Sequence, residues 1–497
     1  MSTTALQRQE TNGRNQRALR KEFRFRHVAR VTLECRTPLH LGAGDGDARA
    51  DQAILRDANG LPLIRGTSLA GLLRVPYRPR DKVEERKRIF GFQDHGTEAD
   101  GSGSRLWISD ACIHDQNDVP VVGLRRRGDL ERDAILGVFL KNESEIRRHT
   151  AIDHRGTARE GALYSEELVG IGHRFTFEME LIDCAGTDGK TPAGQANWEE
   201  LLAGLHSVEF RLGGKTRRGY GSVQVMAEKL VAQSFDLHRV AEPGFGTFHD
   251  YIARSVRLDE PCLILKKKTV TPDPAVPDIE AILELSPRGW WRMGDGTKDC
   301  PGPLVSPRVN WETRPAALDP VLVIPGSAWK GVLRHRATFH FLRLTGKLAG
   351  PGIDVAAVSR TADTVLARIF GEIRGADRGR RGALIVDDIA IEQDVSVQMR
   401  LHRVKIDRFT GGAWPQALFD ERAVWKGVGE IPLRLCILIP HWPHDSEPEL
   451  KAALKAALED IAESRLPIGA GAARGQGFFE GRLKWTDRCA GEKETHT

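Results

Sequence analysis

Two stretches of the chain repeat one another: PLIRGTSLAGLLR at residues 62–74 and LVIPGSAWKGVLR at residues 322–334. Each begins with apolar residues typical of a strand, passes through a turn of glycine with serine, and continues as a helical segment carrying glycine and arginine. The tripeptide IFG follows both, at residues 89–91 and 369–371. Repetition of this kind indicates that one structural unit occurs twice in the chain.

Three further pairs of segments match in the same order along the chain. SRLWISDACI (104–113) matches GALIVDDIAI (382–391), AIDHRGTAREGALYSEELV (151–169) matches KIDRFTGGAWPQALFDERAV (405–424), and RLGGKTRRGYGSVQV (211–225) matches PIGAGAARGQGFFEG (467–481). We therefore predict a fusion of two homologous domains. The predicted parts are a basic tail (1–26), a first domain (27–233), a connector (234–255), a second domain (256–489) and a C-terminal tail (490–497).

The hydrophobic pattern predicts an α+β fold for each copy. Alternating polar and apolar residues predict strands at 27–36 and 174–183. Apolar residues three and four apart predict helices over NWEELLAGLHS and PELKAALKAALEDIAES. The order of these elements fits the ferredoxin-like βαββαβ plan, with helices on one face of an antiparallel sheet.

Composition excludes several classes of protein. The 497 residues are 40% hydrophobic and 28% charged, which is the balance of a globular protein. The chain has neither an apolar run near the roughly 20 residues that span a bilayer nor the apolar core of a signal peptide, so a cytoplasmic protein is expected. Its seven cysteines form no CxxC pair, which argues against a zinc knuckle or a disulfide framework.

The net charge of +5 is unevenly distributed. Residues 1–30 hold eight basic and two acidic side chains, so the rest of the chain is close to neutral. The tail is either an arm that contacts phosphate or a solubilising terminus. A nucleic-acid site in the body must then be a local basic patch.

The glycine-rich segment 213–221 is a candidate phosphate-binding loop. Its glycines allow backbone N–H groups to approach phosphates, and Lys215, Arg217 and Arg218 supply positive charge. A P-loop is excluded because Glu209 stands where that motif needs glycine. The segment matches the RNA-recognition signature in part, with Tyr220 as the aromatic that would stack on a base. The alternative is a tight turn between helix and strand.

Taken together, these motifs resemble the RAMP superfamily. PLHLGAG (38–44), the loop around Asp51, IRGTSLAGLLR, IFG, ISDA and LGGKTRRGYGSV occur in the superfamily's order, and the second copy repeats the series. The chain looks most like the Csm-type and Cmr-type backbone subunits of type III CRISPR effector complexes. The resemblance implies two RRM-like domains, each with a protruding thumb hairpin. It also implies guide RNA, complementary target RNA and other effector subunits as partners, and no membrane.

The resemblance implies that Asp51 cleaves target RNA with a divalent metal, Mg²⁺ or Mn²⁺, by attack of a 2′-hydroxyl on the adjacent phosphate. One loop carboxylate can suffice, since Mg²⁺ commonly binds one or two carboxylates plus phosphate oxygens. In the second copy, aligning Pro303 with Ala53 puts Pro301 opposite Asp51. Asp299 is then the nearest carboxylate, so cutting by that copy is doubtful. The alternative for Asp51 is a carboxylate that only stabilises its own turn.

The resemblance also implies the residues that hold RNA. The turn motif carries a phosphate-binding lysine at Lys330 but Ala70 in the first copy, where Arg65 or Arg74 would compensate. The full predicted set of RNA contacts is Arg65, Ser68, Arg74, Lys215, Arg217, Arg218, Tyr220, Ser327, Lys330, Arg334 and Arg474. The predicted thumb residues are His149, Asp153, His154, Arg155, His402, Asp407 and Arg408, for which an acid–base cluster or a solvated hairpin are the alternatives.

Three other functions stay open at this point. The first is a scaffold whose two copies bind guide RNA without cutting. The second is a guide-processing endoribonuclease that works without metal through a histidine. The third is an RNA-binding module outside CRISPR, which leaves the repeated thumb motif unexplained.

Overall fold

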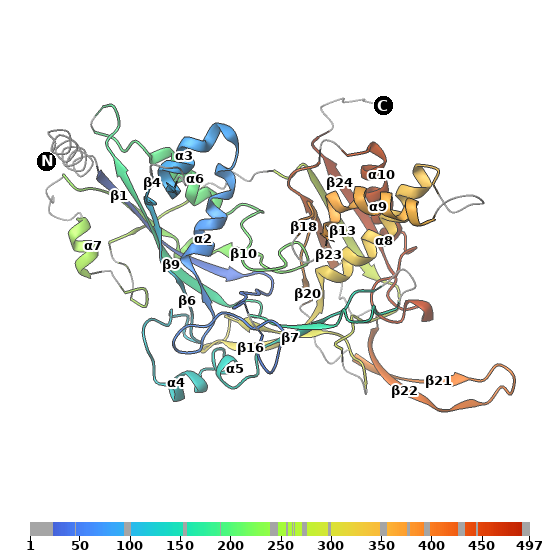
Figure 1. The fold of residues 1–497 in the computed structure, drawn as a ribbon. Coiled ribbons are helices and arrows are strands. Elements are labelled where there is room, and N and C mark those ends of the chain that lie inside the picture. The colour runs from blue at the N-terminus through green and yellow to red at the C-terminus, as the bar shows by residue number, and fades with distance from the viewer. Residues whose placement is uncertain are drawn as a thin grey trace, which may run out of the picture.

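A computed structural model of the chain describes residues 23–489, with the exception of 45, 94–100, 153–156, 189, 239–246, 255–256, 261, 263, 271–275, 297–299, 348–354, 375–377, 392–397, 426–432 and 444–445. Each half forms an antiparallel sheet with helices packed on one face, and the two halves lie side by side (Figure 1). The predicted α+β class is confirmed.

The first half is built on an eight-stranded sheet. Along the path β12-β11-β1-β9-β6-β2, strand β10 also pairs with β1 and β5 with β9. Its elements are β1 (Phe23–Cys35), β2 (Leu63–Ile64), α2 (Gly66–Leu73), α3 (Val83–Phe90), β5 (Leu106–Ile108), β6 (Ala111–Ile113), α4 (Arg127–Arg132), α5 (Gly137–Leu140), β7 (Ile146–His149), β8 (Tyr164–Glu167), β9 (Arg174–Cys184), α6 (Gln195–Gly204), β10 (Val223–Val225), β11 (Val231–Asp236), α7 (Phe248–Arg254) and β12 (Lys266–Lys267). Short strands β3 (Phe92–Gln93) and β4 (Gly101–Ser102) pair with each other.

The second half is built on a four-stranded sheet of order β19-β23-β13-β24. Its elements are β13 (Ile279–Pro287), β14 (Trp290–Trp291), β15 (Val305–Asn310), β16 (Ala317–Ile324), α8 (Gly326–Leu344), α9 (Val355–Phe370), β17 (Glu372–Arg374), β18 (Arg378–Arg380), β19 (Ile385–Val386), β20 (Ile389–Ile391), β21 (Gln398–Ile406), β22 (Ala413–Trp425), β23 (Leu433–Ile439), α10 (Pro448–Ala462) and β24 (Phe479–Asp487).

The two sheets share one topology. The antiparallel central pair β1–β9 corresponds to β13–β23. Strands β10 and β11 lie on the outer side of β1 as β24 lies beside β13, and β5 and β6 lie beside β9 as β19 lies beside β23. Because the repeated motifs fall on the same elements in both halves, the sequence repeat is a repeat of structure.

Each half has its own hydrophobic core between sheet and helices. In the first, Ala29, Val31 and Leu33 of β1 face Leu69 of α2 and Trp198 of α6. Successive residues of a strand point to opposite faces, so this alternation directs every second side chain of β1 under the helices. The second core joins the inner face of β13 to α8, α9 and α10 in the same way. The topology shared by the two halves is therefore accompanied by a matching pattern of buried residues.

The structured body begins and ends at different residues from those predicted for the first domain. Strand β1 starts at Phe23, inside the predicted tail, because Arg24 pairs with Asp236 of β11 at 2.6 Å. The predicted connector is also part of the first half: α7 packs Tyr251 on Val28 of β1. Strand β12, assigned by sequence to the second domain, pairs with β11. These ion pairs and apolar contacts were not visible in the Pro and Gly pattern that predicted a connector.

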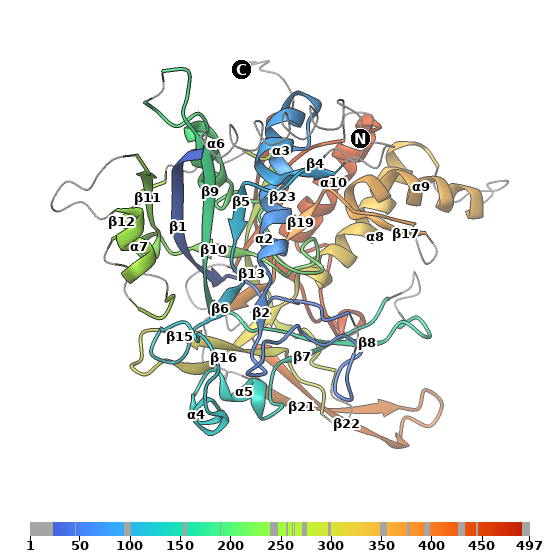
Figure 2. The ribbon, with the colours of Figure 1, turned by 60° about the vertical axis from the view of Figure 1, so that its left-hand side comes forward.

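A hairpin of the second half reaches under the first half. Strands β15 and β16 pair along their length, and Val309 and Ala316 at their far end are buried in the core of the first half. The indole N–H of Trp311 donates to the carbonyl oxygen of Gly172 at 2.8 Å. Figure 2 shows this hairpin below the first sheet, near α4 and α5. The two halves are therefore joined by shared core packing.

Within the part of the chain that the structure describes, no helix is long and apolar enough to cross a membrane. None of the seven cysteines, all within the described residues, forms a disulfide.

Candidate nucleic-acid interface and cleavage site

Asp51 lies on an exposed loop and is held by the hairpin β7–β8. Its Oδ2 accepts hydrogen bonds from the backbone N–H of Ser165 at 2.7 Å and from the Ser165 hydroxyl at 2.8 Å. These bonds hold the pKa of the Asp51 carboxyl below its ordinary value, so the group is ionised at neutral pH. Among the described residues, Oδ1 has no hydrogen-bond partner, and one oxygen of a fixed carboxylate therefore faces outward.

The loop that carries Asp51 is anchored by a second carboxylate. Glu167, whose side chain is 1% exposed, accepts the N–H of Ile54 at 3.2 Å and pairs with Arg56 at 2.5 Å and Arg49 at 3.4 Å. Bonds on both sides of Asp51 restrict the loop, and a restricted loop holds a reactive group in one place. Sequence reasoning missed Glu167, although it directly follows Glu166, the glutamate that the two thumb motifs share.

The donor set at Asp51 fits a metal ion only if RNA supplies further ligands. Within the described ranges, no group of three or more His, Cys, Asp or Glu side chains could hold an ion by itself. One carboxylate oxygen combined with phosphate oxygens and water is a usual arrangement for Mg²⁺. The residues therefore fit a metal that binds together with the nucleic acid.

An exposed cation lies across the hairpin from Ser165, the residue that holds Asp51. Arg148 on β7 lies directly across from Ser165 on β8 and is exposed. Its side chain also approaches Gly296 of the second half. An exposed guanidinium on the strand opposite Ser165 can bind a phosphate of an RNA strand that passes Asp51. Arg148 was not among the predicted contacts.

On the other face of hairpin β7–β8 from Arg148 and Ser165, the side chains point into the protein. Glu166 is fully buried and pairs with Lys215 of the glycine-rich loop and with His149 at 3.1 Å. Tyr220 is 1% exposed, and its hydroxyl lies 2.8 Å from Nε2 of His149. The expectation that Tyr220 stacks on a base is wrong for this arrangement, because its ring is enclosed by the hairpin. Lys215 and His149 are likewise engaged in this internal cluster.

The glycine-rich loop contacts the second half of the molecule. Gly219 has a φ of +118°, and a Cβ there would lie 1.8 Å from Oδ1 of Asp388. The N–H of Asp388 donates to the Gly219 carbonyl at 3.1 Å. Asp388 also pairs with Arg147 of β7 and accepts the N–H of Gly326 at 2.8 Å. Gly219 is therefore needed for the junction of the two copies, which is a structural role that the motif alone did not indicate.

Lys330, predicted to meet phosphate, is also part of this junction. The side chain is 8% exposed, and its ammonium donates to the carbonyl oxygen of Arg217 at 3.0 Å. Burial first, and then the nearby arginines, lower the pKa of Lys330 to about 7. The predicted direct contact is thus wrong here, since the ammonium is used to join the copies.

The arginines around Lys330 form a cationic surface contributed by both copies. We call this surface the basic seam; its members are Arg217, Arg218, Lys330, Arg334 and Arg381. Arg218 and Arg381 are exposed, whereas Arg217 pairs with Glu209 at 2.9 Å and Arg334 with Asp363 at 3.2 Å. Four arginines against two carboxylates leave a local positive excess, to which Lys330, with its pKa of about 7, adds only in part at neutral pH. Such a patch is suited to an RNA backbone.

Further predicted contacts lie on exposed or half-buried positions. Arg65 directly precedes α2, and Arg65, Ser68 and Arg74 are exposed on that helix; Figure 2 shows α2 facing the viewer between the halves. Ser327 is half-buried at the start of α8. Arg474 is 42% exposed and pairs with the buried Glu421 at 2.7 Å.

The backbone hydrogen bonds show that Cys300 is the counterpart of Asp51 in the second copy. The N–H of Glu167 donates to the Gln52 carbonyl at 3.0 Å, and in the second copy the N–H of Arg422 donates to the Pro301 carbonyl at 2.9 Å. Pro301 is therefore the counterpart of Gln52, and the alignment made from sequence was shifted by one residue. Asp299 lies outside the described residues.

The second thumb hairpin, β21–β22, projects from the body (Figure 1) and is longer than β7–β8. At its tip, the Asp407 carboxylate accepts the N–H groups of Phe409 and Thr410, so Asp407 stabilises the turn. Phe409 is 99% exposed, and Arg408 beside it is exposed as well. Asp153, His154 and Arg155 lie outside the described residues.

A buried glutamate recurs at the base of both hairpins. Glu421, 1% exposed, occupies the position of Glu166 and contacts Arg292, Arg403 and Arg474 at 2.7–3.1 Å. His149 and Arg403 occupy equivalent positions, across from Tyr164 and Phe419, and each pairs with the buried glutamate of its own hairpin. The sequence signal was present, as the shared Glu of EEL and ERA, but the pattern alone does not distinguish a buried acid from a solvated one.

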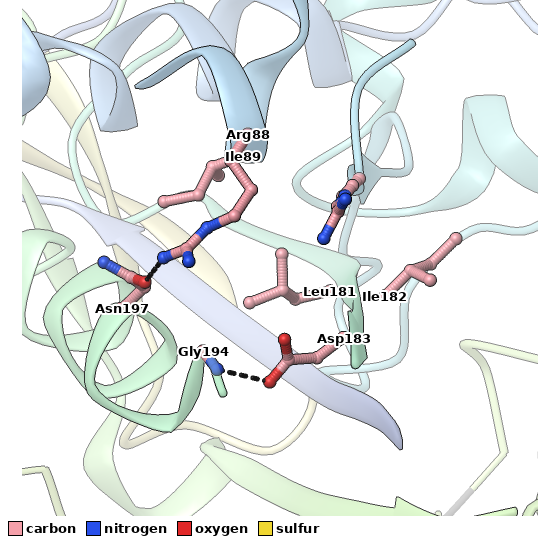
Figure 3. A pocket seen from close by; sticks show the side chains of 8 residues that line it. Arg88, Ile89, Leu181, Ile182, Asp183, Gly194 and Asn197 are labelled. Atoms are coloured by element: carbon pink, nitrogen blue, oxygen red, sulfur yellow. Dashed lines mark hydrogen bonds between the residues drawn. The ribbon is translucent and has the colours of Figure 1, made fainter. Parts of the chain in front are cut away.

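A cavity elsewhere in the first half is not a second site. It lies between α3, α6 and β9, where Arg88 donates to Asn197 and the N–H of Gly194 to Asp183 (Figure 3). Its volume is about 10 Å³, which is no more than one water occupies.

The fold and the seam together define a tandem α+β protein with a surface suited to nucleic acid. The family model of the RAMP superfamily matches residues 32–224 and 292–480. The chain therefore belongs to the RAMP superfamily, with two copies in one polypeptide. A comparison with curated proteins finds no match.

Proposed function

We propose that the chain is a guide-RNA-binding backbone subunit of a type III CRISPR effector complex, and that its first copy cleaves target RNA. Membership in the RAMP superfamily supports the RNA-binding role. The observation that carries the proposal is the basic seam, to which both copies contribute cations at their junction. A continuous RNA strand would cross both copies there, held by its phosphates and independently of its base sequence. The partners would be guide RNA, complementary target RNA and other effector subunits.

The cleavage role rests on Asp51. Its carboxylate is ionised, is fixed by Ser165 and presents one oxygen outward. Asp51, with phosphate oxygens of the target, would hold Mg²⁺ or Mn²⁺, which supplies positive charge to the reacting phosphate when bound. Ser165 would keep the carboxylate oriented, and Arg148 would bind a phosphate beside it.

The test uses the full chain loaded with guide RNA and given a labelled target. We expect Asp51→Ala to keep guide binding and to slow one cut by roughly 100-fold or more, as happens when a group that stabilises transition-state charge is lost. A chelator should stop the same cut. The matched control is Asp81→Ala, which removes an exposed carboxylate away from the hairpin. Unchanged cutting by Asp51→Ala would leave the chain as a scaffold that binds guide without cleaving.

A further inference from the structure

Both copies have a carboxylate and a basic side chain at the same place on the hairpin. The carboxylate is on a loop in the first copy and on a strand in the second. In the first copy these are Asp51 on the loop and Arg148 on β7, with Ser165 between them on β8. The pairing register gives Cys300, His402 and Asp420 as their counterparts. The acidic group of the second copy thus stands on strand β22, where the first copy has Ser165, and the base opposite it is a histidine.

His402 and Asp420 form a directly bonded pair. They lie across from each other on β21 and β22, with Nδ1 of His402 2.6 Å from Oδ1 of Asp420. Oδ2 of the same carboxylate pairs with Arg400 at 2.7 Å. The imidazole is 69% exposed and the carboxylate 21% exposed. A carboxylate on Nδ1 holds the ring in the tautomer whose Nε2 is free to accept a proton.

This arrangement differs from Asp51 in what it can do. Asp51 keeps one carboxylate oxygen without a partner among the described residues, whereas the two oxygens of Asp420 are bonded to the His402 imidazole and the Arg400 guanidinium. Asp420 is therefore poorly suited to a metal ion and well suited to orient a base. Arg400, 62% exposed, lies close enough to bind a phosphate next to the imidazole.

The neighbouring side chains place the pair on the face of the hairpin that corresponds to Asp51. Leu418, two residues before Asp420, is on the same face because side chains alternate along a strand. It is 70% exposed, and so is Leu163, its counterpart two residues before Ser165. An RNA strand that passes Asp51 and Leu163 in the first copy would meet His402, Asp420 and Leu418 at the equivalent point of the second.

We propose that His402, oriented by Asp420, is the general base of a second, metal-independent cleavage site for RNA. This inference rests on the proposed function, since RNA must lie along the hairpin. Nε2 of His402 takes the proton of a 2′-hydroxyl, whose oxygen forms a bond to the adjacent phosphorus. The bond from phosphorus to the 5′ oxygen breaks, and that oxygen takes a proton from water. The products are a 2′,3′-cyclic phosphate and a 5′-hydroxyl, and the imidazolium returns its proton to solvent.

The experiment uses the guide-loaded full chain and an end-labelled target, in the presence of a chelator. We expect the cut that depends on Asp51 to stop and a second product, of different length, to persist. His402→Ala should slow the second cut by roughly 100-fold or more, and added imidazole should restore part of it. Asp420→Asn should slow the same cut and leave the Asp51-dependent one unchanged. His335→Ala, at an exposed histidine of α8, is the matched control.

Absence of a chelator-resistant product would overturn this inference, even where the first cut is seen. A second product that His402→Ala leaves intact would also overturn it. Failure of the proposed function is a separate result: guide RNA would not bind, or the first cut would survive Asp51→Ala. Because the two cuts give products of different length, the two failures are distinguishable.

Discussion

Asp51 and Ser165 show how one side chain can prepare another for chemistry. An exposed aspartate is ordinarily free to rotate, but two bonds from Ser165 fix Asp51 against β8. The same bonds favour the charged form of the carboxyl. The sequence pointed to Asp51 through its family resemblance, but Ser165 lies more than a hundred residues away and only the fold brings the two together.

Replacing Ser165 tests this coupling. Ser165→Ala removes the hydroxyl donor and keeps the backbone N–H, so the pKa of Asp51 should rise toward its ordinary value. As the pH falls, the variant should lose the charged carboxylate at a higher pH than the wild type. An NMR titration of the Asp51 carboxyl carbon measures this shift. An unchanged pKa would show that the Ser165 hydroxyl does not stabilise the charged carboxylate.

The buried Glu421 predicts a large effect on stability. Glu421→Ala leaves Arg292, Arg403 and Arg474 without their shared partner, and removing one member of a buried ion pair typically costs about 3–5 kcal/mol. Glu480→Ala is the control, because Glu480 is 59% exposed and such a surface pair contributes about 1 kcal/mol at most. Denaturant unfolding of both variants gives the comparison. Equal losses in the free energy of unfolding for the two variants would contradict the stabilising role of the buried Glu421.

Glu421 also predicts the direction of acid sensitivity. Burial raises its pKa, but bonds from Gln476 and its arginines lower it more, so the pKa lies below the ordinary 4.5. The stabilisation is then complete above about pH 4.5 and is lost as the pH falls through the lower folded value. Unfolding measured at a series of acidic pH values should show a smaller loss of stability in Glu421→Ala than in the wild type, because other carboxylates with a lowered pKa, such as Asp460, remain in both.

At the scale of elements, repeated motifs were predictable and unrepeated ones were not. The strand, turn and helix of residues 62–74 and 322–334 recur as β2–α2 and β16–α8, because the same apolar spacing forms the same contacts. The hairpin β15–β16 has no long counterpart in the first copy, so no repeat identified it. The one-residue error at Asp51 arose in the same region, where the two copies differ in length and only backbone pairing fixes the register.

Trp311 tests whether this hairpin joins the copies. Trp311→Ala loses the bond to Gly172 and the stacking of Arg174 at 4.3 Å from the ring centroid, which together predict a loss of about 2 kcal/mol. Glu312→Ala, at the exposed neighbouring position, should change stability little. Denaturant unfolding measures both. A Trp311→Ala protein as stable as the control would mean that the hairpin adds nothing to the junction.

At the scale of the whole molecule, the junction of the copies uses residues that look like RNA ligands in the sequence. Lys330 and Gly219 face this interface, and Tyr220, next to Gly219, is enclosed by the first hairpin. A motif records which residues are present but not which neighbour they meet, and fusion gives each copy a permanent neighbour. The remaining exposed cations of the basic seam are then the ones available to RNA.

Lys330 gives this junction a predicted pH dependence. The pKa of Lys330 is about 7 in the folded protein, against an ordinary value of 10.5. Between pH 7 and 10.5 the unfolded chain therefore binds more protons than the folded protein does. Stability should therefore rise as the pH increases from about 7 to 10.5. Lys330→Met removes the ionisable group and should remove that part of the rise. Identical pH profiles of unfolding in the two proteins would show that Lys330 is not buried at the junction.

The most direct test of RNA binding by the paired copies is to sequence the RNA that co-purifies with the full chain from cells that supply CRISPR transcripts. The account predicts RNA of defined length whose 5′ end derives from the repeat. It also predicts that charge reversal at Arg218 and Arg381 depletes this RNA, while Asp51→Ala retains it. Recovery of no RNA, or of random cellular fragments that bind equally to the charge-reversed protein, would contradict it.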